Sequence, residues 1–195
     1  NQDWEDLQRS GDQLYLADIG DNAQSRQQCQ VYRFDEPGPL TDTISSVQTI
    51  RFRYPDGSRD AEALLVDSSS GDLFIITKRE SAARIYRVAA PHSEGTVHVA
   101  TLAGTLPYGG VTGAAQSPDG KHLLVKTYLT VFHYTRTANE SIPDALSRKG
   151  KSIAYRAEPQ GEAIAFARDG NGFFTLSEIP HAGMPQQLYF YKGNP

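Results

Sequence analysis

The feature that most constrains the fold of this chain is a phrase of five residues that recurs four times. Its copies begin at residues 3, 60, 111 and 160 and read DWEDL, DAEAL, VTGAA and QGEAI. The third places of successive copies are 57, 51 and 49 residues apart, and three of the four hold a glutamate. A unit of about 40–50 residues built from short strands is typical of a β-propeller, in which each repeat forms one blade around a central channel.

Each copy of the phrase is followed by a turn and then by an apolar run. The turns are rich in Gly, Asp and Ser, which supply the geometry of tight hairpins. Continuous apolar runs of this length predict strands that are buried on both faces, as between neighbouring blades. These second strands are expected at residues 14–17, 73–76, 123–125 and 173–176.

Alternation of aromatic or apolar residues with polar ones predicts a half-exposed third strand in every repeat. The third strands are expected at residues 29–34, 84–88, 130–134 and 187–191. Fourth strands are expected in three repeats, at residues 47–54, 97–106 and 152–157, and the last repeat has none. The best helix signal is a short one near residues 143–146.

The repeats therefore predict an all-β fold, a single β-propeller domain with four visible blades and five in the intact protein. The approximate blades are residues 1–57, 58–108, 109–159 and 160–195. The two residues before the first phrase are too few to supply the strand that the last blade lacks. We expect an upstream segment, or association with another chain, to close the ring.

Composition and charge exclude several kinds of partner. The net charge is −4 and the basic residues are scattered, which argues against nucleic acid. No apolar run approaches the ~20 residues that a membrane span needs. The single cysteine, Cys29, excludes an intramolecular disulfide and a cysteine zinc site.

The glutamates of the repeated phrase predict a site on the channel axis. If the phrase forms the innermost strand, Glu5, Glu62 and Glu162 converge, and carboxylates at short range must bind a cation, pair with Lys or Arg, or take up protons. Ca²⁺ prefers such oxygen ligands. The expected calcium ligands are Glu5, Glu62, Glu162, Asp18, Asp21 and Asn22. The alternative is a structural ring of salt bridges made by Lys78, Arg79 or Lys126.

Polar side chains at the ends of the second strands are candidates for catalysis at one mouth of the channel. The candidates are Lys78, Lys126, Tyr128 and Glu178. The lysines and the tyrosine could hold an anionic substrate group or a developing oxyanion. The alternative, that they neutralise the glutamates, stays open. Which way they face depends on the register, because a slip of one residue reverses it.

The ordered motifs resemble those of a family of uncharacterised, exported bacterial β-propeller proteins. The matching runs are DWEDL, LYLADIGDN, VYRFDEP, RYPDG, DAEALLVD, ITKR, VTGAAQSPDG, KTY, QGEAIA and TLSE, which cover nearly the whole chain in order. The resemblance implies a further blade before DWEDL and a secreted or periplasmic location. More loosely, the acidic channel is similar to those of calcium-dependent propeller lactonases and phytases. Gly113 departs from a uniform acidic ring, and we expect a ligand to enter there.

Two functions follow from these patterns. The first is a metal-dependent hydrolase that acts on an ester, a lactone or a phosphoester, with a small molecule as its partner. The second is a non-enzymatic ligand-binding or protein-binding propeller whose acidic channel is structural, since this fold hosts many functions.

Overall fold

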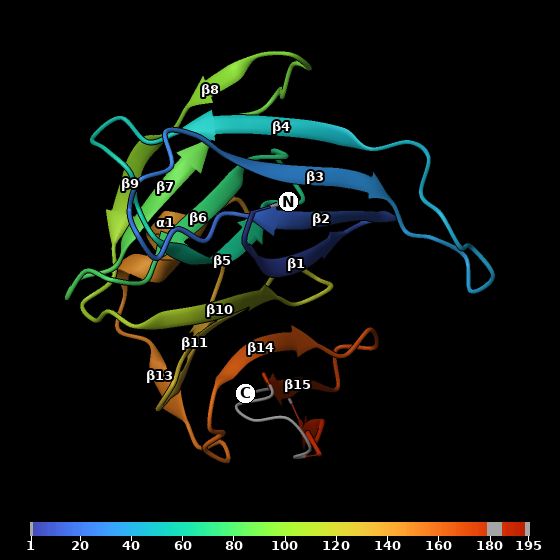
Figure 1. The fold of residues 1–195 in the computed structure, drawn as a ribbon. Coiled ribbons are helices and arrows are strands. Elements are labelled where there is room, and N and C mark those ends of the chain that lie inside the picture. The colour runs from blue at the N-terminus through green and yellow to red at the C-terminus, as the bar shows by residue number, and fades with distance from the viewer. Residues whose placement is uncertain (1, 179–184, 194–195) are drawn as a thin grey trace.

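The chain folds into four β-sheets arranged as the blades of a β-propeller, as the repeats predict (Figure 1). The computed structural model describes residues 2–178 and 185–193. The first sheet contains β1 (Trp4–Ser10), β2 (Gln13–Asp18), β3 (Cys29–Asp35), β4 (Gln48–Arg53) and β8 (Val97–Val99). The second contains β5 (Ala61–Val66), β6 (Leu73–Thr77), β7 (Arg84–Val88) and β9 (Thr101–Thr105).

The other two sheets repeat this order from the inner to the outer strand. The third contains β10 (Val111–Gln116), β11 (His122–Thr127), β12 (Val131–Thr135) and β13 (Lys151–Ile153). The fourth contains β14 (Gly161–Phe166), β15 (Gly172–Ser177) and β16 (Tyr189–Lys192). A short helix, α1 (Ile142–Ser147), lies between β12 and β13 where a helix was expected.

One strand departs from the predicted plan. The fourth strand expected over residues 97–106 is two strands, which are separated at Ala100. β9 completes the second sheet, whereas β8 pairs in parallel with β4 at the outer edge of the first sheet. The second repeat therefore also adds an outer strand to the preceding blade.

The hydrophobic core lies between neighbouring blades. β5 shows how, because Leu64 and Val66 pack with the first sheet while Ala63 and Leu65 pack with the third. All residues of β5 and β6 are buried, as expected for strands with a blade on either side. The same expectation is wrong for β2 and β15, whose side chains are only partly buried, because the first and last sheets each pack on one neighbour.

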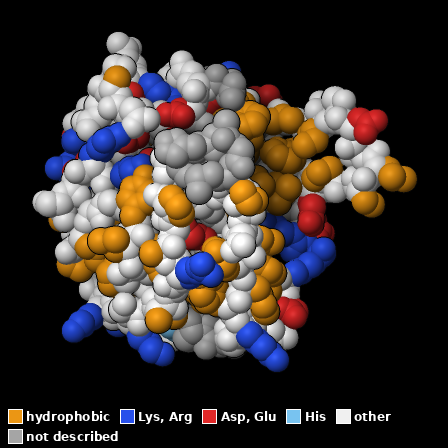
Figure 2. Space-filling view, turned by 60° about the horizontal axis from the view of Figure 1, so that its bottom comes forward, with side chains coloured by type: hydrophobic (Ala, Val, Ile, Leu, Met, Phe, Trp, Pro, Cys, Tyr) orange, Lys and Arg blue, Asp and Glu red, His pale blue; other side chains and the backbone are white. Residues whose placement is uncertain are grey.

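Apolar side chains are exposed where the first and last sheets face one another. A cavity of about 420 Å³ is lined there by side chains of both sheets. Trp4 is 55% exposed and Leu188 63% exposed in this region. Figure 2 looks at the molecule from the side of the last sheet and shows exposed hydrophobic groups among the polar ones. The expected association with an upstream segment or another chain stays a prediction.

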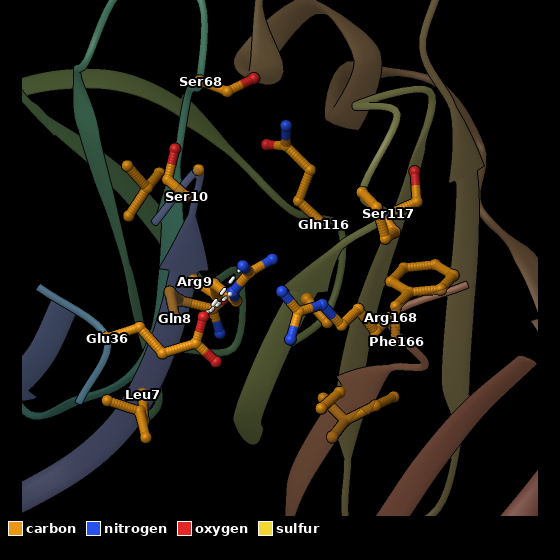
Figure 3. Close-up of a pocket in the computed structure, with 16 residues that line it drawn as sticks. Leu7, Gln8, Arg9, Ser10, Glu36, Ser68, Gln116, Ser117, Phe166 and Arg168 are labelled. Atoms are coloured by element: carbon orange, nitrogen blue, oxygen red, sulfur yellow. Dashed lines mark hydrogen bonds and ion pairs between the residues drawn. The ribbon is translucent and has the colours of Figure 1, made fainter. Parts of the chain in front are cut away.

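A second cavity lies where the four inner strands end. It has a volume of about 350 Å³ and is lined by residues at or just after the ends of β1, β5, β10 and β14 (Figure 3). The tight hairpins that follow these strands shape it. They turn through glycines in the left-handed conformation, such as Gly71 with φ 77° and Gly120 with φ 72°.

Candidate functional site

A β-bulge near the start of every inner strand leaves one residue of that strand without a paired residue on the second strand. Each inner strand skips one residue in its register with the second strand of the same blade. The skipped residues are Glu5, Glu62, Thr112 and Glu162. A bulge re-aims the side chain of its extra residue, so the blades present three glutamates and one threonine from equivalent positions.

The position equivalent to the glutamates in the third blade is Thr112 and not Gly113. Gly113 pairs with Lys126 and is part of the regular ladder. A Cβ atom on Gly113 would lie 2.4 Å from the backbone oxygen of Glu162, so the missing side chain lets β14 approach β10 closely. The expectation that a ligand enters at Gly113 is therefore wrong, because the neighbouring blade occupies that space.

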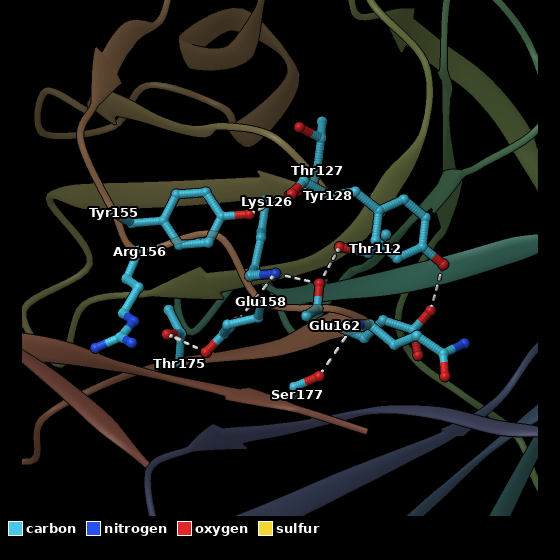
Figure 4. A network of polar contacts seen from close by, with 12 residues as sticks. Thr112, Lys126, Thr127, Tyr128, Tyr155, Arg156, Glu158, Glu162, Thr175 and Ser177 are labelled. Carbon is cyan, nitrogen blue, oxygen red and sulfur yellow. Dashed lines mark hydrogen bonds and ion pairs between the residues drawn. The ribbon is translucent and has the colours of Figure 1, made fainter. Parts of the chain in front are cut away.

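Lys78 joins two of the three glutamates. Its ammonium group donates a hydrogen bond to Glu62 Oε1 and lies 3.6 Å from Glu162 Oε1. The same ammonium lies 3.0 Å from the hydroxyl of Tyr128. That hydroxyl donates to Glu162 Oε1 at 2.6 Å (Figure 4). The contacts of the expected salt-bridge ring are thus present at Lys78. The other carboxylate oxygen, Glu62 Oε2, is buried and has no hydrogen-bond partner among the residues that the structure describes.

The surroundings of Glu5 and Glu62 favour the protonated forms of their carboxyl groups. Burial raises the pKa of Glu5 to about 8, with further increases from the negative charges of Glu62, Asp3 and Glu162. Burial also raises the pKa of Glu62 to about 7, although the hydrogen bond from Lys78 opposes the increase. At neutral pH the cluster therefore retains protons that ordinary surface glutamates would have lost.

Three of the expected calcium ligands are engaged in other contacts. Asp18 accepts hydrogen bonds from the backbone N–H groups of Gln2 and Asp3 and forms an ion pair with Arg26 at 3.0 Å. Asp21 accepts from the backbone N–H groups of Ser25 and Arg26 at 3.0 and 2.8 Å. The side-chain oxygen of Asn22 accepts from Arg79. These residues fix the loop after β2, and their oxygens are occupied by partners within the chain.

The catalytic candidates fall into two groups. In each second strand, one residue pairs with the inner-strand residue just before the bulge. The next residue along the chain is equivalent in the second, third and fourth blades, and it is Lys78, Tyr128 and Glu178 respectively. Lys78 and Tyr128 contact the glutamate cluster, as described above. Glu178 is exposed, and its backbone N–H donates to the carbonyl of Gln160 at 2.8 Å.

Lys126 does not lie at the mouth of the channel, where we expected it. It is fully buried between the third and fourth blades, where its ammonium contacts the carbonyl of Gly161 and lies 3.6 Å from Glu158 Oε2 (Figure 4). It also lies 5.1 Å from the ring centre of Tyr155. The register explains the difference, because Lys126 pairs with Gly113 and is therefore equivalent to the buried Ile76 of the second blade, two places before the position of Lys78.

Sequence reasoning missed two polar residues of this region, Thr112 and Glu158. Thr112 donates a hydrogen bond to the carbonyl of Gly161 at 3.2 Å, and Glu158 accepts one from Thr175 at 2.8 Å. The spacing could have revealed Thr112, because it lies 50 residues after Glu62 and 50 before Glu162. No repeated signal marks Glu158, which lies in the connection before β14.

The carboxylates of the cluster fit a divalent cation only in part. Within residues 2–178 and 185–193, no group of three or more His, Cys, Asp or Glu side chains has an arrangement that could hold a metal ion as it stands. Glu5, Glu62 and Glu162 provide the oxygen donors that calcium prefers, but Lys78 already contacts two of them. Calcium therefore stays a prediction.

Comparison with known proteins shows the fold. No protein-family model matches the chain, and no curated protein matches it in sequence. A TolB structure from Acinetobacter baumannii is 16% identical with a TM-score of 0.53, over 93% of this chain and 40% of that one. Hydrazine synthase of Kuenenia stuttgartiensis is 15% identical with a TM-score of 0.52, over 95% and 45%.

A periplasmic gluconolactonase of Pseudomonas aeruginosa, PpgL, is also similar in structure. It is 13% identical with a TM-score of 0.50, over 97% of this chain and 57% of that one. The chain therefore spans about half the length of the solved structures it matches. Among the described residues, no helix has the length and apolar character needed to cross a membrane. These likenesses identify the chain as an array of β-propeller blades.

Proposed function

We propose that the glutamate cluster belongs to a calcium-dependent hydrolase that acts on a small ester, lactone or phosphoester at the central channel. The observation that supports this is the charge balance of the cluster. When all groups are ionised, the carboxylates of Glu5, Glu62 and Glu162 face one ammonium, that of Lys78, and at least two negative charges are uncompensated. A divalent cation would neutralise them, and protons do so in its place at neutral pH.

Calcium would be held by the three glutamates. When bound, it would polarise the carbonyl or phosphoryl oxygen of the substrate. Glu5 and Glu62 would have to release their protons for the ion to bind, because metal ligands act in the deprotonated form. Calcium affinity would therefore increase as the pH rises from about 6 to about 9.

Lys78 and Tyr128 would act on the substrate. Burial disfavours the charge on Lys78, but its contacts with Glu62 and Tyr128 outweigh this effect and raise its pKa, so the ammonium stays charged. An ammonium and a hydroxyl 3.0 Å apart can both donate to a developing oxyanion. In this proposal Lys126 has no catalytic role, because it is fully buried between blades.

A second candidate function is a binding propeller with a structural channel. The contacts of Lys78 with Glu62, Glu162 and Tyr128 favour it, because they link the second, third and fourth blades without any ion. In this case the cluster would stabilise the ring, and ligands would bind elsewhere. For either function we propose a location outside the cytoplasm, which the periplasmic gluconolactonase likeness supports.

Thermal unfolding with calcium or with a chelator tests the proposal. A ligand at about one hundred times its Kd stabilises the folded state by about 2.7 kcal/mol, which raises the Tm of a domain of this size by about 5–10 °C. We expect this increase in the parent protein and in a Glu94→Gln variant, whose exposed carboxyl is remote from the cluster. We expect no increase in Glu62→Gln.

The outcome separates the two functions. A Tm that calcium does not change in the parent would exclude the calcium site. A calcium response that depends on Glu62, together with turnover of generic esters or phosphoesters that is lost in Glu62→Gln, supports the hydrolase. A calcium response without turnover of any of these substrates favours the binding propeller.

A further inference from the structure

The cavity at the other end of the inner strands is separate from the glutamate cluster. The glutamates stand at the second place of β1, β5 and β14, and the cavity lies where these strands end. Strands rise about 3.3 Å per residue, so Ser10 and Arg168 at the turn end of the cavity lie about 15–20 Å along the chain from Glu5 and Glu162. Between them, the Gln8 amide donates to the carbonyl of Ala114 at 2.7 Å and joins β1 to β10.

The cavity carries an arginine that has no partner within the described chain. Arg168 follows β14 and points into the cavity, and no hydrogen bond or ion pair engages its guanidinium among the described residues (Figure 3). Arg9 lies opposite and forms an ion pair with Glu36 at 2.9 Å. Its longer pair, at 3.6 Å, is with Asp12, whose side chain is fully exposed and does not line the cavity.

The charge of the lining side chains is therefore positive, although the chain as a whole has a net charge of −4. Among the described residues that line the cavity, the charged groups are the two guanidinium groups of Arg9 and Arg168 and the carboxylate of Glu36. A guanidinium presents several N–H donors in a plane that matches the oxygens of a carboxylate or a phosphate. Arg168 is thus placed to bind an oxyanion that enters the cavity.

Uncharged polar groups surround the arginines. Gln116 lines the cavity, and its side-chain oxygen is buried without a hydrogen-bond partner in the described part of the chain. The hydroxyls of Ser10 and Ser68 also line it and make no side-chain hydrogen bond within the described residues. These groups can donate to and accept from hydroxyl groups of a ligand.

We propose that this cavity binds a small organic oxyanion, a carboxylate or a phosphate, that also bears hydroxyl groups. Arg168 binds the oxyanion, and the amide of Gln116 and the serine hydroxyls bind the hydroxyl groups. The volume of about 350 Å³ is within the range of small-molecule sites. The site does not depend on calcium or on the glutamate cluster.

Isothermal titration calorimetry with three related sugars tests the proposal. Glucose 6-phosphate and glucuronate share the hydroxyl pattern of glucose and add a phosphate or a carboxylate. We expect at least one of the two anions to bind at least about tenfold more tightly than glucose, as charge-assisted hydrogen bonds contribute. The tighter of the two identifies the preferred oxyanion.

Two variants locate the binding. Arg168→Gln should weaken binding of the preferred anion at least about tenfold, while Arg53→Gln, which removes an exposed arginine from the outer strand β4, should leave it unchanged. Glu62→Gln should also leave it unchanged, which distinguishes this site from the proposed calcium site. Failure of both anions to bind more tightly than glucose, or equal losses in Arg168→Gln and Arg53→Gln, would overturn the proposal.

Discussion

Replacing Glu5 with glutamine should remove part of the pH dependence of the free energy of unfolding. Burial and the neighbouring carboxylates raise the pKa of Glu5 from 4.5 to about 8, so the folded protein binds this proton more tightly than the unfolded chain does. Glu5 therefore stabilises the fold fully below pH 4.5, and this contribution is lost as the pH rises through about 8. At 1.36 kcal/mol per pH unit the full shift would correspond to about 5 kcal/mol, and screening by water at this partly exposed carboxyl reduces the loss to a few kcal/mol.

Urea unfolding between pH 5 and pH 9 measures this contribution. The free energy of unfolding of the parent should fall, relative to that of Glu5→Gln, by about 1.4 kcal/mol per pH unit between pH 5 and pH 8. Titrating groups outside the cluster are common to both proteins, so their contributions largely cancel in the difference, while the neighbouring carboxylates lose the repulsion of Glu5 in the variant. Above pH 8 the glutamine variant should be the more stable protein, because it lacks the ionised carboxylate.

A matched control and calcium make the result decisive. Glu94→Gln removes an exposed carboxyl outside the cluster and should follow the pH profile of the parent. If calcium binds the cluster, saturating calcium should abolish the difference in slope, because the ion takes the place of the protons. A difference between the parent and Glu5→Gln that stays constant from pH 5 to pH 8 would show that Glu5 is neither buried nor crowded by other carboxylates, and the cluster would be refuted.

Three further changes test the packing around the site. Lys126→Met should lower the free energy of unfolding by about 3–5 kcal/mol, because it leaves the carboxylate of Glu158 buried without its cation. In urea unfolding, the double variant with Glu158→Gln should recover part of this loss. If it recovers nothing, the pairing of Lys126 with Glu158 is contradicted. Burial lowers the pKa of His133 to about 4, so its contribution to stability is present above pH 6.5 and is lost as the pH falls through about 4. His133→Phe should therefore lose about 2 kcal/mol less than the parent between pH 6.5 and pH 5, and equal losses would exclude this effect. Gly113→Ala should destabilise the protein by about 1–3 kcal/mol in thermal unfolding, because the new Cβ would meet the backbone of β14. Gly38→Ala should have no such effect, because a Cβ there has no contact closer than 3.7 Å. Equal effects of the two variants would contradict the close approach of β14 to β10.

The blades could be predicted because their signals are local and repeated. The turn glycines and the apolar runs between them recur in every repeat, so a signal that is ambiguous in one repeat is resolved by the other three. The addition of β8 to the preceding blade could not be predicted in this way. This addition depends on pairing between residues that are far apart in the sequence. Residues 97–99 carry no signal that assigns them to the first blade and not to the second.

The site could be predicted only as far as the bulges allowed. The glutamates stood out because the same residue type recurs at one place of the phrase, and the structure shows that place to be the bulge. Thr112 was missed because VTGAA was aligned one residue too late, and the error carried over to Lys126. A bulge adds a residue to one strand only, so the facing of its partner strand cannot be read from spacing alone.

The bulges and the hairpins together explain why the channel has two different ends. At the start of the inner strands, each bulge takes one residue out of the regular pairing. The side chain of that residue has no cross-strand neighbour directly opposite. Glutamate at three of these four places makes that end acidic. At the other end the chain turns, and residues just beyond the strand, such as Arg168, reach over the cavity. Gln8 lines the cavity and joins β1 to β10 through its hydrogen bond to Ala114, so we expect a change at the turn end, such as Arg168→Gln, to leave the glutamate end unchanged.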